Sequence, residues 1–366
     1  MVAWRPEAAI AGSDRSVADL GEWGIIGALA GRMPAGPLTS VGIGDDAAVV
    51  TTPSGSVVAA VDLLLEGRHF RLDWSSAYDI GVKAAARSLA DIAAMGAVNT
   101  ALLVALATPG TLPASWATSL ADGLAAEATR AGAGVVGGDT ASADLVTLSV
   151  TALGDLEGRA PVLRSGARAG DLLAVAGPLG RSAAGLALLS AGLGGVTAVP
   201  GTVPAERSGA LGTPAASAHL DLVSAQLRPA PPYDAGPEAA LLGATAMIDV
   251  SDGLVADTGH VADASGVQIE IRGAALETGS LATAAASVLA AGTAPAGEPA
   301  ATAEPAAALA LTWVLTGGED HSLVATFPPS VTLPPRWRII GEVRPGQGVT
   351  VDGVPHPGAG GWQHFT

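Results

Sequence analysis

The chain has no cysteine and only one lysine, Lys83, among its 366 residues. The absence of cysteine excludes disulfide bonds, thiolate nucleophiles and metal sites built from thiolates. With a single lysine, positive charge beside an anionic ligand has to come from arginine or from a metal ion. The sequence also lacks a Gly-x-x-x-x-Gly-Lys-Ser/Thr loop and a His-Arg-Asp loop, so it indicates neither a P-loop nor a protein-kinase architecture.

Long apolar runs and basic clusters are missing as well. No run of about 18 apolar residues free of Gly, Pro and charge occurs, so no transmembrane helix is predicted. The N-terminal segment carries acidic side chains and no compact apolar stretch, unlike a signal peptide. The formal net charge of −16 excludes the basic footprint that nonspecific nucleic-acid binding requires. A cytoplasmic location with no membrane or nucleic-acid partner is therefore expected.

The composition predicts two α/β domains with cores of small aliphatic side chains. Hydrophobic residues make up 49% of the chain and aromatic residues only 3%. The length fits two domains, and a composition change predicts a boundary near residue 158. We therefore expect an N-terminal domain over 1–158 and a C-terminal domain over 159–366.

Hydrophobic periodicity predicts regular elements in the first half of the chain and at the start of the second. The predicted helices are 16–31, 76–95, 113–131 and 181–192. The predicted strands are 47–50, 57–62, 101–107, 133–136, 145–153 and 171–176. Two Gly-, Pro- and Ala-rich segments, 192–217 and 291–308, are expected to be flexible or surface insertions.

Aspartates recur at the ends of apolar strands and in Gly-rich turns. The segments are Gly44-Asp45-Asp46, Val61-Asp62, Gly137-Gly138-Asp139-Thr140, Ile248-Asp249-Val250-Ser251-Asp252-Gly253 and Gly317-Gly318-Glu319-Asp320, and Asp91 lies on the predicted helix 76–95. Two carboxylates about 4 Å apart repel by roughly 4 kcal/mol at an intermediate dielectric, so a converging set needs cations. Magnesium takes oxygen ligands, usually a few carboxylates with waters and substrate phosphates. The pattern therefore favours a magnesium-dependent nucleotide site.

Ordinary turn chemistry is the alternative for each of these acids taken singly. An aspartate bonds its own backbone in a turn, and a neighbouring glycine accepts positive φ. Asp252-Gly253 is the most turn-like pair, whereas Asp45-Asp46 and Asp91 are harder to explain in this way. His69 lies near a predicted strand end, where a histidine is more often structural than functional.

The order of these motifs along the chain resembles the thiamine-monophosphate kinase family. The matching segments are Gly42-Ile43-Gly44-Asp45-Asp46, Val61-Asp62, Glu66-Gly67-Arg68-His69-Phe70, Ala90-Asp91-Ile92-Ala93-Ala94-Met95-Gly96, Gly137-Gly138-Asp139-Thr140, Leu163-Arg164-Ser165-Gly166, Ile248-Asp249-Val250-Ser251-Asp252-Gly253, Gly317-Gly318-Glu319-Asp320 and His364-Phe365-Thr366. One motif alone is weak, but eight in the family's order, with Val61-Asp62 and Glu66–Phe70 counted as one, form a specific signal. The match runs from about residue 20 to the C-terminus.

The resemblance implies a fold and an activity. The fold is that of the aminoimidazole-ribotide synthetase superfamily. In that fold the N-terminal domain joins a second subunit in an intersubunit β-barrel, the C-terminal domain is α/β, and the active site lies between the domains. A homodimer is thus implied. The implied reaction transfers the γ-phosphoryl group of ATP onto the phosphate of thiamine monophosphate.

The resemblance also implies site residues. The implied magnesium ligands are Asp46, Asp62, Asp91, Asp139, Asp249 and Asp252, with Asp45 as a secondary candidate. The implied ATP contacts are Gly138, Arg164 and Ser251. The implied contacts with thiamine monophosphate are His69, Glu319 and Phe365. Several Mg²⁺ ions per site are expected, and no general base is needed.

The chain departs from the family pattern at several positions. Ala60 and Val61 replace a Ser-Thr pair before Asp62, and His321 replaces a Tyr after the Gly-Gly-Glu-Asp segment. Selenophosphate synthetase and the hydrogenase-maturation relative are disfavoured because the chain lacks their cysteine. An aminoimidazole-ribotide synthetase-like enzyme and a noncatalytic nucleotide- or metal-binding relative remain alternatives. A related pyrimidine phosphate remains an alternative acceptor.

Overall fold

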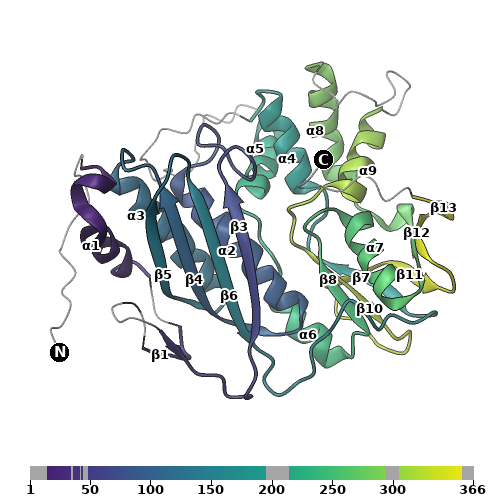
Figure 1. Cartoon of the computed structure of the whole chain (residues 1–366). Coiled ribbons are helices and arrows are strands. Elements are labelled where there is room, and N and C mark those ends of the chain that lie inside the picture. The colour runs from purple at the N-terminus through teal and green to yellow at the C-terminus, as the bar shows by residue number, and fades with distance from the viewer. Residues whose placement is uncertain are drawn as a thin grey trace. The chain divides into compact units, whose positions relative to one another are not determined.

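The computed structural model describes residues 15–33, 36–41, 43, 48–194, 214–292 and 305–356. The chain divides into two compact units, which are described separately (Figure 1). Of the described residues, the first unit contains those of 15–92 and 97–158. The second unit contains 93–96, 159–194, 214–292 and 305–356. No helix of the described part is long and apolar enough to cross a membrane.

A four-stranded sheet lies at the centre of the first unit. In spatial order its strands are β3 (Val58–Leu65), β6 (Thr147–Asp155), β4 (Val98–Thr108) and β5 (Gly134–Ser142). β6 pairs antiparallel with β3 and β4, whereas β4 and β5 are parallel. The outer strands β3 and β5 do not pair, so within the described residues the sheet does not close into a barrel. A separate pair is formed by β1 (Thr39–Val41) and β2 (Val49–Val50).

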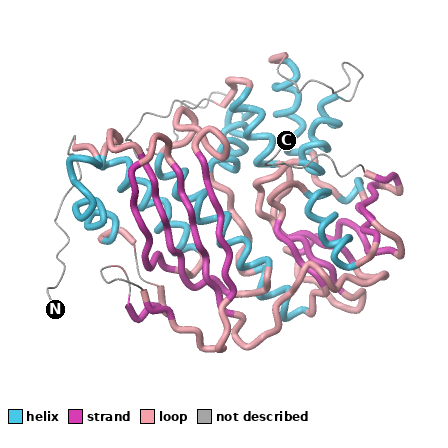
Figure 2. The backbone as a smooth tube through the Cα atoms, in the orientation of Figure 1, coloured by secondary structure: helices cyan, strands magenta, loops and turns pink. Residues whose placement is uncertain are grey.

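Helices α2 (Ala77–Ala94) and α3 (Ala114–Arg130) cover one face of this sheet (Figures 1 and 2). The two helices approach each other at Gly81 and Gly123, where a Cβ atom on either glycine would overlap the backbone of the other helix. Helix α1 (Val17–Ala30) packs against α3. It begins at Ser16, which forms a capping box with Asp19.

On the opposite face of the sheet, side chains of strand β3 are exposed. Along β3, Val61 and Leu63 are 65% and 50% exposed, whereas Leu64, which points to the helices, is fully buried. Side chains alternate between the two faces of a strand. β3 therefore presents apolar side chains on both of its faces.

The second unit is built on a seven-stranded sheet. In spatial order the strands are β13 (Val354–Pro355), β12 (Gly348–Val351), β9 (Gln268–Ile271), β11 (Trp337–Arg344), β7 (Leu172–Ala176), β10 (Leu323–Phe327) and β8 (Ala246–Asp249). Only the β12–β9 pair is parallel. The helices are α4 (Arg181–Ser190), α5 (Pro214–Leu227), α6 (Ala235–Leu242), α7 (Leu254–Ser265), α8 (Gly279–Ala290) and α9 (Pro305–Thr316), with a short 3₁₀ turn, η1 (Gly273–Ala275).

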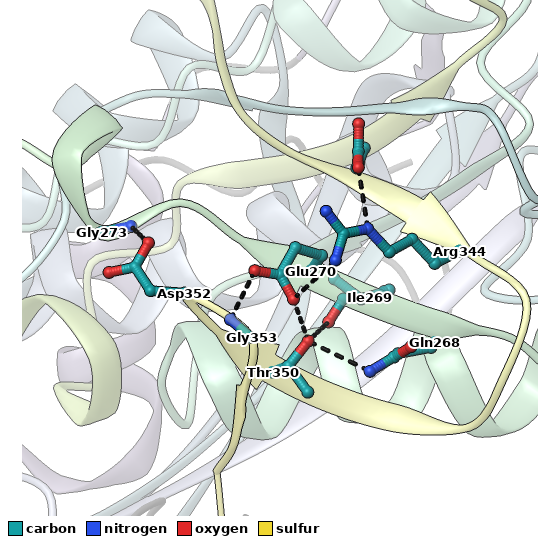
Figure 3. Close-up of polar contacts among 9 residues, drawn as sticks. Gln268, Ile269, Glu270, Gly273, Arg344, Thr350, Asp352 and Gly353 are labelled. Carbon is teal, nitrogen blue, oxygen red and sulfur yellow. Dashed lines mark hydrogen bonds and ion pairs between the residues drawn. The ribbon is translucent and has the colours of Figure 1, made fainter.

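A buried carboxylate joins three strands of this sheet (Figure 3). Glu270 of β9 is only 4% exposed. It accepts hydrogen bonds from the Gly353 N–H, at 2.8 Å, and from the Thr350 hydroxyl, and it lies 3.6 Å from Arg344 of β11. Because these partners compensate its burial, the Glu270 carboxylate has a structural role: it holds β9, β11 and β12 together at one end of the sheet.

The elements predicted from periodicity are present. For example, the predicted helices 76–95 and 113–131 correspond to α2 and α3, and the predicted strand 171–176 corresponds to β7. Both units mix helices and strands, so the α/β prediction is confirmed.

Helices begin within the two segments that were expected to be flexible or surface insertions. Helix α5 begins at Pro214 and helix α9 at Pro305, so 214–217 and 305–308 are helical. Proline suits the first turn of a helix because its φ is already near −65° and its missing N–H would have no helical partner. Residues 195–213 and 293–304 of these segments lie outside the described residues.

Candidate active site

Asp62 lies inside β3, and its side chain contacts helix α2. Its Oδ2 accepts a hydrogen bond of 2.8 Å from the Ser88 hydroxyl, and its Oδ1 lies 3.7 Å from Nη2 of Arg87. The prediction that Asp62 ends a strand is wrong, because Leu63, Leu64 and Leu65 continue the strand. The carboxylate is therefore held between sheet and helix.

Asp91 lies on the same face of α2 as these partners of Asp62. It follows Ser88 by three residues and Arg87 by four, the spacings at which helical side chains are neighbours. Asp91 is partly exposed on a helix whose other residues are mostly buried. The structure thus places two of the predicted magnesium ligands, Asp62 and Asp91, along one interface between β3 and α2.

Gly138 and Asp139 lie on the edge strand β5. The Gly-Gly-Asp-Thr segment was expected to be a turn, but it is part of this strand. The register places Asp62, Val150, Val104 and Gly138 in one row across the sheet. Gly138 has no room for a side chain, since a Cβ atom would overlap the Val104 carbonyl. Asp139 is exposed, and its Oδ1 accepts the Thr140 N–H at 2.8 Å.

A cavity of about 110 Å³ opens beside this segment. Residues 137–140 form one wall, and apolar side chains of α1, α3 and β4, among them Ile26, Leu120 and Val104, form the others. Sequence analysis does not identify these apolar lining residues, because a leucine that lines a cavity has the same helical spacing as one that fills a core. The cavity offers a flat apolar ligand a position beside a carboxylate.

His69 lies in the turn that follows β3. Its Nδ1 accepts the Leu65 N–H at 3.0 Å, and its own backbone N–H donates to the Leu65 carbonyl at 3.0 Å. With Nδ1 acting as acceptor, the proton of the neutral ring is on Nε2. These two bonds fix the ring beside the end of β3, and its Nε2 atom is buried.

In the second unit, the segment that follows β8 carries three predicted site residues. Asp249 is the last residue of β8, and Ser251 and Asp252 lie in the loop between β8 and α7. The Ser251 carbonyl accepts the Glu319 N–H at 2.8 Å. The structure thus joins predicted metal-binding and nucleotide-binding residues to Glu319, the predicted acceptor contact.

His321 contacts Asp249 directly, a relationship that the sequence does not indicate. His321 Nδ1 lies 3.0 Å from Asp249 Oδ2. The two residues are 2% and 4% exposed, respectively. They are far apart in the sequence, and only the pairing of the 250–251 loop with 319–322 brings them together.

Asp257, in the first turn of α7, holds the same loop from the other side. Its Oδ2 accepts the N–H groups of Asp252, at 3.0 Å, and Gly253, at 2.9 Å. The residue is 2% exposed. Burial and the nearby charge of Asp249 raise the pKa of Asp257 to about 8. This residue was not among the predicted site residues, although an acid in the first turn of a helix is a recognisable signal.

Asp320 fixes the segment that carries Glu319. Its Oδ2 accepts the Gly180 N–H at 2.6 Å and its Oδ1 accepts the Ser182 N–H at 2.9 Å, which caps helix α4. Burial raises the pKa of Asp320 to about 6, although both N–H donors oppose the shift. Glu319, with φ 66°, has a left-handed backbone that non-glycine residues seldom adopt.

Arg164 lies in an exposed bend that runs beside β8. The Met247 N–H donates to the Leu163 carbonyl at 3.0 Å, and the Ser265 hydroxyl donates to the Arg164 carbonyl at 3.1 Å. The backbone of this bend is thereby fixed, and the guanidinium remains exposed. Asp45, Asp46 and Phe365 lie outside the described residues.

The donor chemistry of the predicted ligands fits magnesium. Among the described residues, no group of three or more His, Asp or Glu side chains is placed to hold a metal. Magnesium is usually held by one or two carboxylates with waters and substrate phosphates. The predicted ligands offer only oxygen atoms. Burial raises the pKa of Asp257, and the nearby charge of Asp249 raises it further, so acidic groups are close together in this region.

The chain is similar in sequence to proteins of known function. Residues 44–156 match the family described as AIR synthase related protein, N-terminal domain. The chain is 47% identical over 350 residues to a thiamine-monophosphate kinase of Mycobacterium tuberculosis, covering 94% of this chain and 92% of the relative.

Solved structures agree in fold. The thiamine-monophosphate kinase of Stenotrophomonas maltophilia is similar with a TM-score of 0.69 and 30% identity, over 87% of this chain and 93% of that one. A structure of AaThiL complexed with AMPPCP and TMP has a TM-score of 0.68 and 31% identity, over 88% of this chain and 92% of that one. Both share the mixed α/β fold of the AIR synthase-like superfamily.

Proposed function

The chain belongs to the thiamine-monophosphate kinase family, and from this premise we propose how its residues support the reaction. The reaction is the ATP-dependent phosphorylation of thiamine monophosphate to thiamine diphosphate. The structural observation that carries the proposal is the hydrogen bond between Glu319 and Ser251, because it joins the predicted acceptor contact to the loop of predicted metal ligands.

The reaction needs alignment of phosphates more than acid–base chemistry. An oxygen of the acceptor phosphate attacks the γ-phosphorus of ATP. The bond from that phosphorus to the β–γ bridging oxygen breaks, and ADP leaves with the electron pair. A phosphate monoester with a second pKa near about 6 is already ionised at neutral pH, so no side chain has to remove a proton.

The residues that would hold magnesium are the predicted set in both units: Asp46, Asp62, Asp91, Asp139, Asp249 and Asp252. When bound, magnesium neutralises charge on the phosphates and orients them. Asp62 is preorganised by Ser88, and Asp249 by its contact with His321. Replacement of the usual hydroxyls by Ala60 and Val61 leaves only backbone carbonyls there as further oxygen donors.

We assign the nucleotide to the β5 side of the first unit. The apolar cavity beside residues 137–140 suits the adenine ring, and Gly138 forms part of its wall. Arg164 and Ser251 of the second unit would contact the phosphates. Arg164 matters particularly because the chain's only lysine, Lys83, is buried and cannot provide positive charge there.

We assign the acceptor to His69, Glu319 and Phe365. His69 is assigned to the acceptor because it matches the family position that contacts thiamine monophosphate, and its ring is held by the hydrogen bond from the Leu65 N–H to Nδ1. Glu319, an acceptor when ionised, can bind the amino group of a pyrimidine ring.

We also propose that two copies of the chain associate through the open face of the first unit's sheet. Val61 and Leu63 make β3 apolar on this face, and large exposed apolar patches mark interaction surfaces. The superfamily barrel would form by pairing such sheets. Light scattering should give a dimer, and Val61→Glu should give a monomer. A monomeric wild-type protein would contradict the proposal. The cytoplasmic location remains a prediction from the sequence.

A coupled ADP-release assay tests the function. With ATP and magnesium, thiamine monophosphate should support turnover and unphosphorylated thiamine should not. Asp139→Asn should reduce turnover by more than 100-fold. The matched control is Asp144→Asn, an exposed acid in the following turn, which should leave turnover unchanged. Turnover with thiamine alone, or a folded and fully active Asp139→Asn variant, would contradict the assignment.

A further inference from the structure

We propose that His321 is a positioning residue that orients the Asp249 carboxylate for magnesium. The inference rests on the proposed function, in which Asp249 is a metal ligand. His321 itself touches neither substrate nor metal in this role. It acts through the hydrogen bond that it makes with Asp249.

The geometry fixes the direction of this hydrogen bond. Nδ1 of His321 lies 3.0 Å from Asp249 Oδ2. An ionised carboxylate can only accept, so Nδ1 carries the proton and donates it. Nε2 of His321 is buried and has no hydrogen-bond partner in the described part of the chain. A neutral ring with its proton on Nδ1 therefore fits the site, because it avoids burying an unpaired N–H.

The backbone holds the histidine ring in register with β8. The His321 N–H donates to the Val250 carbonyl at 2.9 Å, and the Val250 N–H donates to the Ser322 carbonyl at 2.8 Å. His321 has φ 51°, in the left-handed region. Such a backbone is kept only where its surroundings determine it strongly. Here it presents the imidazole to the last residue of β8.

The contact leaves one Asp249 oxygen available. Oδ2 accepts from His321, and Oδ1 has no hydrogen-bond partner in the described part of the chain. A metal-binding carboxylate is commonly hydrogen-bonded on one oxygen in this way, and loss of the outer partner typically costs 10- to 100-fold in metal affinity. Asp252 and Asp257 lie close to Asp249, and the Asp257 carboxylate accepts the Asp252 N–H at 3.0 Å.

The experiment compares three substitutions at this position. His321→Asn keeps a side-chain N–H close to the position of Nδ1, so it should preserve the donor to Asp249. His321→Gln carries its N–H near the position of Nε2, too far along the side chain to replace that bond. His321→Leu has a similar size and no donor. The His321 N–H donates to Val250, and the Val250 N–H donates to Ser322, so neither bond involves the side chain of residue 321 and none of the three substitutions removes a donor or acceptor from them.

Two measurements are made on the full chain. The first is Mn²⁺ binding followed by electron paramagnetic resonance in the presence of AMPPCP, which requires no turnover. The second is the Mg²⁺ concentration that gives half-maximal activity. His321→Leu and His321→Gln should weaken both by about tenfold or more, and His321→Asn by no more than about threefold. The KM for thiamine monophosphate should not change.

The outcomes separate this inference from the proposed function. Wild-type protein that binds Mn²⁺ but does not phosphorylate thiamine monophosphate would contradict the proposed function. The Mn²⁺ affinities of the three variants would still test the role of His321. Wild-type metal affinity in folded His321→Leu or His321→Gln would overturn the inference. An equal loss of metal affinity in His321→Asn and His321→Gln would also overturn it, because the packing of the ring and not its N–H donor would then explain the effect. If His321→Leu does not fold, the Asn and Gln pair decides.

Discussion

Asp62 of β3 and Ser88 of α2 are joined by a hydrogen bond of 2.8 Å between the sheet and the helix that covers it. The same hydroxyl lies 3.2 Å from the Val150 carbonyl of the neighbouring strand β6. A single serine thus fixes the position of the helix and the orientation of a predicted magnesium ligand. The proposed role of Asp62 would therefore couple metal affinity to helix packing at this point.

Ser88→Ala is expected to weaken magnesium activation. The substitution removes the donor to Asp62 Oδ2 and leaves Arg87, 3.7 Å away, as the remaining partner. The Mg²⁺ concentration for half-maximal activity should rise by about tenfold, as for other outer partners of metal ligands. Ser287→Ala, which removes a hydroxyl bonded only to the Thr283 carbonyl of α8, is the control. An unchanged Mg²⁺ requirement in Ser88→Ala would contradict the prediction.

Asp257→Asn should remove part of the pH dependence of stability in metal-free protein. The pKa of Asp257 is raised to about 8, against about 3.9 in the unfolded chain. Between these two pKa values the folded state keeps a proton on Asp257 that the unfolded chain has lost. The contribution of this protonation to the free energy of unfolding is therefore fully present below about pH 4 and is lost as the pH rises through about 8.

Asparagine suits this position because Oδ2 alone accepts both backbone N–H groups, so one amide oxygen can replace it. The free energy of unfolding in urea should therefore fall less between pH 5 and pH 9 for Asp257→Asn than for the wild type. Exposed Asp263, changed to Asn on the same helix, is the control. Parallel pH profiles for wild type and Asp257→Asn would show the prediction to be wrong.

Asp320→Asn, in contrast, should destabilise the protein at neutral pH. The two oxygens of Asp320 accept different N–H groups, from Gly180 and Ser182, so an amide can satisfy only one of them. A buried N–H left without a partner costs about 1–3 kcal/mol. Urea unfolding at pH 7 measures the loss. A variant as stable as the wild type would indicate that the amide nitrogen finds another acceptor.

Gly81→Ala and Gly123→Ala should each lower stability, because a Cβ atom at either position would overlap the backbone of the facing helix. The helices would have to separate, and overpacking of this kind typically costs about 1–3 kcal/mol. Gly279→Ala, at the start of α8 with no atom within 4 Å of the new methyl group, should be neutral or slightly stabilising. Thermal unfolding of the three variants measures the difference. Equal melting temperatures would argue against the close approach of α2 and α3.

Sequence patterns predict the elements of the first unit because their apolar residues recur with regular periods. Helix α2 and strand β4 follow from spacing alone, and Asp91 is recognisable as an acid on a mostly apolar face of its helix. The starts of α5 and α9 are missed because Pro214 and Pro305 lie in Gly/Pro/Ala-rich segments, where proline also suggests a loop.

The supporting residues of the site are harder to predict, because their roles depend on long-range hydrogen bonds. His321 and Asp249 are far apart in sequence, and so are Asp320 and its partners Gly180 and Ser182. Local sequence shows that Asp320 is acidic but does not show that both of its oxygens are occupied by a helix N-terminus. Pairing between distant strands and loops provides that information.

The left-handed backbone of Glu319, with φ 66°, also restricts how this site can evolve or be redesigned. Only glycine, asparagine and aspartate enter that conformation readily, and β-branched or bulky residues do so at considerable cost. Few residue types can therefore replace Glu319 without strain, and this limits the acceptor preferences that substitutions at this position can produce. Changing acceptor preference through larger or branched residues would first require the Gly317–His321 segment to be rebuilt.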